Sequence, residues 1–165
     1  MATVVVPFRG ANGKSRLALP EPERRALALS MLRRVLGAAA EVGDVLLVTD
    51  DEEARSLAPR WVADPGGGQG AAVAAALAEA GSGPTLVVNA DLPQIEPQDL
   101  RDLLAAIPPD GVALVEAADG TTNALGLASP ELFEPLYGPG SASRFREGGA
   151  VPVDLPRLAE DLDTL

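Results

Sequence analysis

The chain has no cysteine and no histidine. The first absence excludes disulfide bonds, thiolate metal sites and cysteine nucleophiles. The second removes the commonest general base and the commonest zinc ligand. Aromatic residues are only 3% of the sequence, so a core must be built from Ala, Val and Leu. Any catalysis therefore has to use carboxylates, hydroxyls, Lys or Arg, and a metal ion held by oxygen.

Positive charge is also scarce, and the net charge is −11. This balance argues against nucleic acid as a partner, because binding a phosphate backbone needs a basic face. No apolar run approaches the length of a membrane span, so we expect no membrane partner. Met1 leads directly into a strand-like run without a leader pattern, and we therefore expect a cytoplasmic protein. With 165 residues, 47% of them hydrophobic, the chain is expected to form one globular domain over residues 1–165.

Apolar, β-branched runs alternate with segments of helical spacing along the chain. We expect strands at Ala2–Val6, Val45–Thr49, Trp61–Ala63, Thr85–Val88, Val112–Val115, Leu125–Ala128 and Val151–Val153. We expect helices at Pro22–Ala39, Asp51–Leu57, Gly68–Ala80, Pro97–Ile107 and Ser141–Arg146. Strands that are apolar throughout and separated by helices are typical of an α/β protein with a mostly parallel sheet covered on both faces. Such sheets bind ligands beyond the carboxyl ends of their strands.

The only lysine, Lys14, lies in a glycine-containing loop just after the first expected strand, and Arg9 and Arg16 flank it. Backbone N–H groups and cations in such a loop are typical of a polyphosphate site. A Walker A loop is disfavoured, because Phe8 stands where its first glycine belongs and Pro20 and Pro22 delay the helix. A redox dinucleotide fold is also disfavoured, because no Gly-x-Gly-x-x-Gly follows the first strand.

Further short motifs follow in order along the chain. They are Val6-Pro7-Phe8-Arg9 through Lys14-Ser15-Arg16-Leu17, Asp64-Pro65-Gly66-Gly67-Gly68-Gln69-Gly70, Ala90-Asp91-Leu92-Pro93, Asp119-Gly120-Thr121-Thr122-Asn123-Ala124, Tyr137-Gly138-Pro139-Gly140-Ser141 and Asp161-Leu162-Asp163-Thr164. Together they resemble the motifs of the 2-phospho-L-lactate/phosphoenolpyruvate guanylyltransferases, in the molybdenum-cofactor guanylyltransferase-like superfamily. The resemblance implies a three-layer, Rossmann-like fold of the nucleotide-diphospho-sugar transferase type, forming a single nucleotidyltransferase domain.

The resemblance also implies an activity. GMP would pass from GTP to the phosphate of phosphoenolpyruvate or 2-phospho-L-lactate, with release of pyrophosphate. In the family this reaction belongs to the biosynthesis of coenzyme F-420, and a downstream transferase consumes the unstable product. Some members use 3-phosphoglycerate, and the sequence does not separate these acceptors. The attacking group is a phosphate that needs no general base, which suits a chain without histidine.

The implied roles fall into four groups: catalysis, nucleotide binding, acceptor binding and metal binding. Lys14, Arg16 and Asp91 are the expected catalytic residues, and the nucleotide contacts are expected from Pro7, Arg9, Lys14, Gly68, Gly70 and Asp91. Thr122, Asn123, Gly138 and Ser141 are expected to hold the acceptor. Asp91, which follows a buried strand, and the pair Asp161 and Asp163 are expected to bind Mg²⁺, a cation that prefers oxygen ligands.

Simpler interpretations remain for each group. Asp91 also suits a turn or helix cap, and Asp161 and Asp163 an acidic tail. The segments around Thr122 and Gly138 also suit ordinary turns. A non-catalytic nucleotide-binding module of the same fold, or a nucleotidyltransferase for another small phosphorylated acceptor, is the alternative function.

Overall fold

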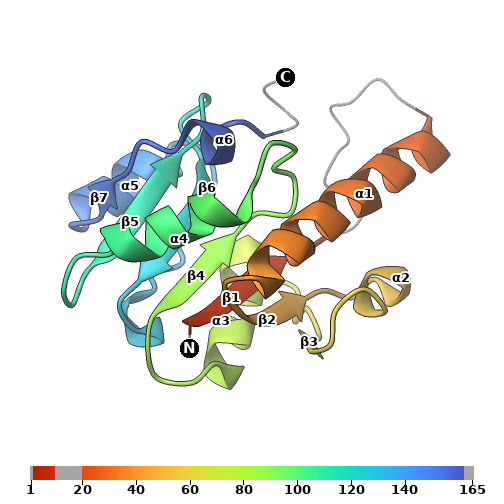
Figure 1. Cartoon of the computed structure of the whole chain (residues 1–165), viewed down its shortest axis with the longest axis horizontal. Coiled ribbons are helices and arrows are strands. Elements are labelled where there is room, and N and C mark those ends of the chain that lie inside the picture. The colour runs from red at the N-terminus through yellow and green to blue at the C-terminus, as the bar shows by residue number, and fades with distance from the viewer. Residues whose placement is uncertain (1, 10–19, 162–165) are drawn as a thin grey trace.

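The computed structural model describes residues 2–9 and 20–161, in which strands and helices alternate (Figure 1). The strands are β1 (Ala2–Pro7), β2 (Gly43–Val48), β3 (Trp61–Val62), β4 (Thr85–Val88), β5 (Val112–Glu116), β6 (Thr122–Leu127) and β7 (Val151–Pro152). The helices are α1 (Glu21–Ala40), α2 (Glu52–Arg55), α3 (Gln69–Glu79), α4 (Pro97–Ala106), α5 (Ser141–Glu147) and α6 (Pro156–Ala159), with a 3₁₀ turn at Pro130–Leu132.

The strands form one sheet in the order β3-β2-β1-β4-β6-β5-β7. Strands β3, β2, β1 and β4 pair in parallel. Strand β6 runs antiparallel to both β4 and β5, and β7 pairs in parallel with β5. The sheet is therefore mostly parallel, as the sequence predicts, with one reversed strand inside it.

Helices cover both faces of the sheet (Figure 1). On one face Val4 and Val6 of β1 pack in a core with the buried residues of α1 and α4. On the other face Val5 packs with the buried residues of α3 and α5. Alternation along a strand sends successive side chains to opposite faces, so apolar strands are buried on both sides. This arrangement confirms the three-layer, Rossmann-like fold.

Most element boundaries differ from the expected ones by one to three residues, and three differences are informative. Strand β6 begins at Thr122, three residues earlier than the apolar run indicates, because Asn123 also pairs with the end of β4 through the Asn89 N–H at 3.0 Å. Helix α1 begins at Glu21, so Pro22 is its second residue. Helix α6 was not expected, because four residues are too few to show a helical period.

Of the helices in the described ranges, none combines the length and apolar character needed to cross a bilayer.

Two glycines provide a matched test of the packing. A Cβ at Gly43 would lie 2.2 Å from the carbonyl oxygen of Ala2, its partner in the β1–β2 ladder, whereas a Cβ at Gly37 in α1 would meet nothing within 4 Å. We expect Gly43→Ala to lower the free energy of unfolding by ~1–3 kcal/mol. Gly37→Ala should raise it by ~0.5–1 kcal/mol, because alanine favours a helix interior. Urea unfolding of both variants measures this, and equal effects would contradict the β1–β2 register.

Candidate active site

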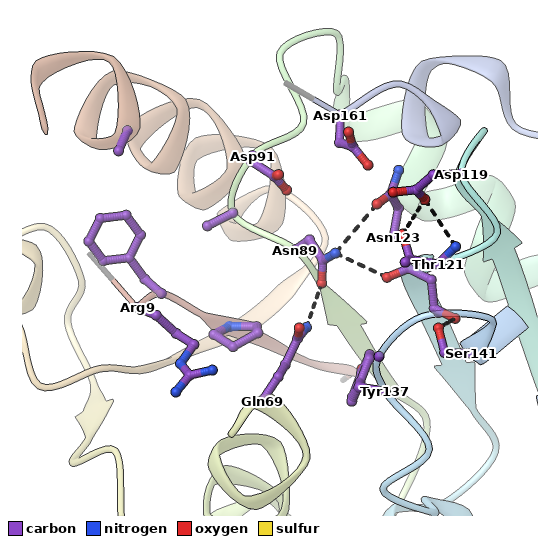
Figure 2. A pocket seen from close by; sticks show the side chains of 16 residues that line it. Arg9, Gln69, Asn89, Asp91, Asp119, Thr121, Asn123, Tyr137, Ser141 and Asp161 are labelled. Carbon is purple, nitrogen blue, oxygen red and sulfur yellow. Dashed lines mark hydrogen bonds between the residues drawn. The ribbon is translucent and has the colours of Figure 1, made fainter. Parts of the chain in front are cut away.

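A cleft of about 360 Å³ opens beyond the carboxyl ends of β1 and β4, where the antiparallel β6 begins (Figure 2). Its walls come from segments that are far apart in the sequence. The lining residues are Pro7, Phe8, Arg9, Ala28, Gln69, Asn89, Ala90, Asp91, Asp119, Thr121, Thr122, Asn123, Tyr137, Gly138, Ser141 and Asp161. The cleft therefore lies where parallel α/β sheets bind their ligands.

Two buried carboxylates enter the cleft from separate segments, Asp91 after β4 and Asp161 after α6 (Figure 2). Asp91 is 9% exposed and Asp161 4% exposed. A third, Asp119, is exposed and accepts hydrogen bonds from the N–H and the hydroxyl of Thr121. Within the described ranges, no three acidic side chains are grouped closely enough to form a metal site by themselves.

A pair of buried hydroxyls forms another part of the wall. The Oγ1 atom of Thr122 and the Oγ atom of Ser141 lie 2.9 Å apart, and neither side chain is more than 2% exposed. Gly138 lines the cleft beside them with φ of +118°, a conformation that side chains rarely adopt. Arg144 donates hydrogen bonds to the carbonyls of Leu136, Tyr137 and Pro139, so it holds this loop in place.

Three amide side chains form a continuous chain across the floor of the cleft (Figure 2). Gln69, at the start of α3, donates to Asn89 Oδ1 at 2.8 Å. Asn89 donates to the carbonyl of Thr122 at 3.0 Å and to Asn123 Oδ1 at 3.4 Å. Asn123 in turn donates to the carbonyls of Leu158 and Ala159. The chain therefore links α3, β4, β6 and α6.

Only some of the residues expected to contact the nucleotide line the cleft. Pro7 and the exposed Arg9 line the cleft. Gly68 caps α3 with φ of +101°, whereas a Cβ at Gly70 would lie 2.8 Å from the Cβ of Pro135, so packing against that proline explains this glycine. Neither glycine lines the cleft. Lys14, Arg16 and Asp163 lie outside the described residues.

Comparison with known proteins identifies the family. Residues 15–147 match the family described as the MobA-like NTP transferase domain. A phosphoenolpyruvate guanylyltransferase from Sphaerobacter thermophilus is 40% identical over 185 residues, covering 99% of this chain and 89% of that protein. Another, from Streptomyces scabiei, is 36% identical over 185 residues, covering 98% and 86%. The chain belongs to the phosphoenolpyruvate guanylyltransferase family. It is therefore a nucleotidyltransferase, and the family supports a guanylyltransferase role.

A solved structure has the same fold as this member of the guanylyltransferase family. It is a proposed nucleotide-diphospho-sugar transferase from Desulfovibrio desulfuricans G20, which superposes with a TM-score of 0.75. The alignment covers 92% of this chain and 79% of that one, at 15% identity. At such low identity the likeness concerns the fold alone, and it confirms the nucleotide-diphospho-sugar transferase type.

Several lining residues of the guanylyltransferase-family cleft were not predicted as site residues. Three of them stand inside or directly beside the motifs quoted above, namely Gln69, Asn89 and Asp119. Their positions, after a strand or at a glycine loop, could have indicated that they belong to the site. Tyr137 also stands in a quoted motif, directly before Gly138. Its ring packs against Phe133 and Phe145, with centroids 5.9 and 5.7 Å away, and burial raises the pKa of its phenol, which stays neutral at physiological pH.

Asp51 also follows a strand at the same edge, yet it does not line the cleft. It caps α2 by accepting from the N–H of Ala54 at 3.0 Å, and it pairs with Arg25 of α1, whose Nη1 lies 2.8 Å from Oδ2. The guanidinium of Arg25 holds the pKa of this carboxyl below its ordinary value of 3.8, although burial opposes that shift. Asp51 is therefore a structural link between two helices.

We expect Asp51→Asn to lower the free energy of unfolding at pH 7 by less than ~1 kcal/mol, because asparagine keeps the cap and loses only a partly exposed ion pair. A lowered folded pKa means that the pair stabilises the protein above the unfolded pKa and stops doing so as pH falls through the folded one. The difference between variant and wild type should therefore shrink below about pH 4, given the ordinary value of 3.8. Urea unfolding from pH 7 to pH 3 measures it, and a constant difference would contradict the ion pair.

Proposed function

We propose that the protein transfers GMP from GTP to the phosphate of phosphoenolpyruvate, with 2-phospho-L-lactate as the alternative acceptor, in coenzyme F-420 biosynthesis. The observation that carries this proposal is the division of the cleft. Buried hydroxyls and a glycine loop form one part of its wall, and buried carboxylates another. The names of relatives that are 36–40% identical over nearly the whole chain support the donor and the acceptor.

The reaction needs little proton transfer. An oxygen of the acceptor phosphate attacks the α-phosphorus of GTP and forms a new P–O bond. The bond from the α-phosphorus to the oxygen bridging to the β-phosphorus breaks, and pyrophosphate leaves with its electron pair. A phosphate dianion is already a nucleophile at neutral pH, so the enzyme contributes alignment and charge neutralisation. This suits a chain that lacks histidine and cysteine.

The described lining of the cleft is negatively charged, so binding negatively charged substrates there requires additional cations. Among its described lining residues three carboxylates face one cation, Arg9, while the substrates carry several negative charges. Lys14 and Arg16 are proposed to supply charge to the β- and γ-phosphates. Asp91 and Asp161, with Asp163 as the further candidate, are proposed to hold Mg²⁺.

The donor set fits this cation, because Mg²⁺ is usually bound through one or two carboxylates, with water and substrate phosphates completing its shell. When bound there, Mg²⁺ would neutralise charge on the reacting phosphates.

The acceptor is proposed to bind at Thr122, Ser141 and Gly138. In the hydrogen-bonded pair one hydroxyl donates its only hydrogen to the other, and the second hydroxyl keeps its own hydrogen to donate to a phosphate or carboxylate, while a glycine lets the backbone approach closely. The small, buried hydroxyl pair suits a compact acid better than a pterin or a sugar. Asn123, also predicted for the acceptor, uses its N–H groups elsewhere.

The remaining expectations belong to the same proposal. The product would be a phosphoanhydride that joins GMP to the acceptor; a downstream transferase is proposed to consume this unstable product, and the reaction is proposed to take place in the cytoplasm.

The first experiment is a matrix of pyrophosphate release with Mg²⁺, crossing GTP, ATP and CTP with phosphoenolpyruvate, 2-phospho-L-lactate and 3-phosphoglycerate. The downstream transferase is included so that product does not accumulate. We expect release with GTP and phosphoenolpyruvate. Release with GTP and one of the other acids would keep the class and change the acceptor. If the protein binds nucleotide but releases no pyrophosphate with any combination of nucleotide and acceptor, the result would instead support a non-catalytic module.

Asp91 and Asp51 provide a matched pair for the metal role, because both follow strands at one edge and only Asp91 lines the cleft. We expect Asp91→Asn to reduce turnover by ~10²-fold or more, by analogy with the loss of one stabiliser of the transition state. Asp51→Asn should keep near wild-type turnover. Turnover of both at saturating Mg²⁺ measures this, and a loss below about tenfold in Asp91→Asn would remove Asp91 from the proposed site.

A further inference from the structure

We propose that Asn123 is a positioning residue, which fastens α6 to the sheet and thereby directs the carboxylate of Asp161 into the cleft. The inference rests on the proposed function for the role of Asp161. It changes the role predicted for Asn123 from the sequence, which was contact with the acceptor.

The amide of Asn123 is fully used by the protein. Its Nδ2 atom donates to the carbonyl of Leu158 at 3.0 Å and to that of Ala159 at 3.1 Å, which accounts for both N–H groups. Its Oδ1 atom accepts from Asn89 at 3.4 Å, and the residue is only 1% exposed. The opposite orientation would place Oδ1 against two carbonyl oxygens. Asn123 therefore has no donor left for an acceptor molecule.

Helix α6 depends on such external contacts. It has four residues, far fewer than an isolated helix needs for stability in water. Its Leu158 side chain is completely buried in the core beneath α1 and α4. Its last residue, Ala159, is one of the two that Asn123 binds, and Asp161 follows two positions later. The side-chain amide of Asn123 thus binds the backbone just before Asp161.

A second anchor holds the other side of the same helix. Arg157 donates through Nε and Nη2 to the buried carboxylate of Asp99 in α4, at 2.8–3.0 Å, and its Nη1 lies 3.1 Å from Glu96. Asp99 itself is fixed, because it accepts from the backbone N–H of Glu96 in the capping box of α4. Helix α6 is therefore held between the sheet and α4.

The Asn123 anchor also connects to the opposite wall of the cleft. Asn89 donates to it and accepts from Gln69, the first residue of α3. Side chains that bind a metal ligand directly typically contribute 10–100-fold to metal affinity by fixing its orientation. Asn123 would act in the same way through the backbone of Leu158 and Ala159. We therefore expect metal affinity to be the property that responds when Asn123 changes.

The test is Mn²⁺ binding to the full chain, followed by electron paramagnetic resonance with and without GTP. Mn²⁺ favours the same oxygen ligands as Mg²⁺. Asn123→Leu keeps the branched outline of the side chain and removes its polar groups. The control is Thr85→Val, which removes a buried hydroxyl that donates to Gly83 on the strand end opposite the cleft. We expect Asn123→Leu to raise the Mn²⁺ Kd by about tenfold or more. Thr85→Val should leave this Kd unchanged, even if it lowers the Tm.

Kinetics separate positioning from direct contact. If Asn123 positions Asp161, Asn123→Leu raises the Mg²⁺ concentration needed for half-maximal rate and leaves the acceptor KM unchanged at saturating Mg²⁺. An unchanged Mn²⁺ Kd together with a raised acceptor KM would overturn the inference. If wild type and Asp91→Asn bind Mn²⁺ equally, the metal site of the proposed function fails, and this result differs from a failure of Asn123 alone.

Arg157→Ala tests the inference at a side chain that is itself 47% exposed and does not touch Asn123, although it removes one partner of the buried Asp99 carboxylate. We expect it to raise the Mn²⁺ Kd by a smaller factor than Asn123→Leu, and by more than Thr85→Val. Should Asn123→Leu fail to fold, Arg157→Ala decides alone. A wild-type Kd in that variant would overturn the inference.

Discussion

The reversal of β6 within an otherwise parallel sheet determines where the polar residues of the cleft lie. In a parallel strand the first residues lie at the edge opposite the ligand. Because β6 runs antiparallel to β4 and β5, its first residues, Thr122 and Asn123, lie beside Asn89 at the end of β4. The backbone N–H of Asn89 pairs with Asn123, which extends the ladder up to the cleft. The hydroxyl pair with Ser141 and the amide contact with α6 both depend on this placement.

Polar contacts between segments far apart in the sequence then fix the walls of the cleft. Arg144 holds the loop around Gly138 by donating hydrogen bonds to carbonyl groups of that loop. Asn123 and Arg157 hold α6 from two sides. Asn123 lines the cleft, but the N–H groups that make these contacts are used on protein carbonyls. Because a buried donor or carbonyl without a partner is costly, such networks specify one arrangement of the chain. The groups proposed to meet the substrates are therefore pre-organised by groups that do not.

Prediction from the sequence succeeded where a residue's role follows from its neighbours in the chain. The apolar strands, the helices of ten or more residues and the polar residues after β4 were recognisable from spacing alone. It was wrong or incomplete where a role depends on a distant partner. Thr122 and Asn123 were placed before the expected strand Leu125–Ala128 and not inside it, because their pairing with Asn89 is not visible in a polar tripeptide. Gly70 stays predicted as a nucleotide contact, but its close approach to Pro135 could not be seen in the sequence. The pairing of Arg25 with Asp51 was equally invisible there.

The placement of charge in the cleft bears on the proposed chemistry. The acceptor phosphate has to remain a nucleophile, so a cation bound tightly to it would lower its reactivity. Among the described residues, the part of the wall proposed for the acceptor offers hydroxyls and backbone, and the nearby Arg144 is occupied by carbonyls. The leaving pyrophosphate, in contrast, gains charge as the bond breaks and needs cations. In the proposed arrangement, neutral donors hold the acceptor and cations surround the triphosphate, which would stabilise the transition state more than the bound substrates, the condition for catalysis.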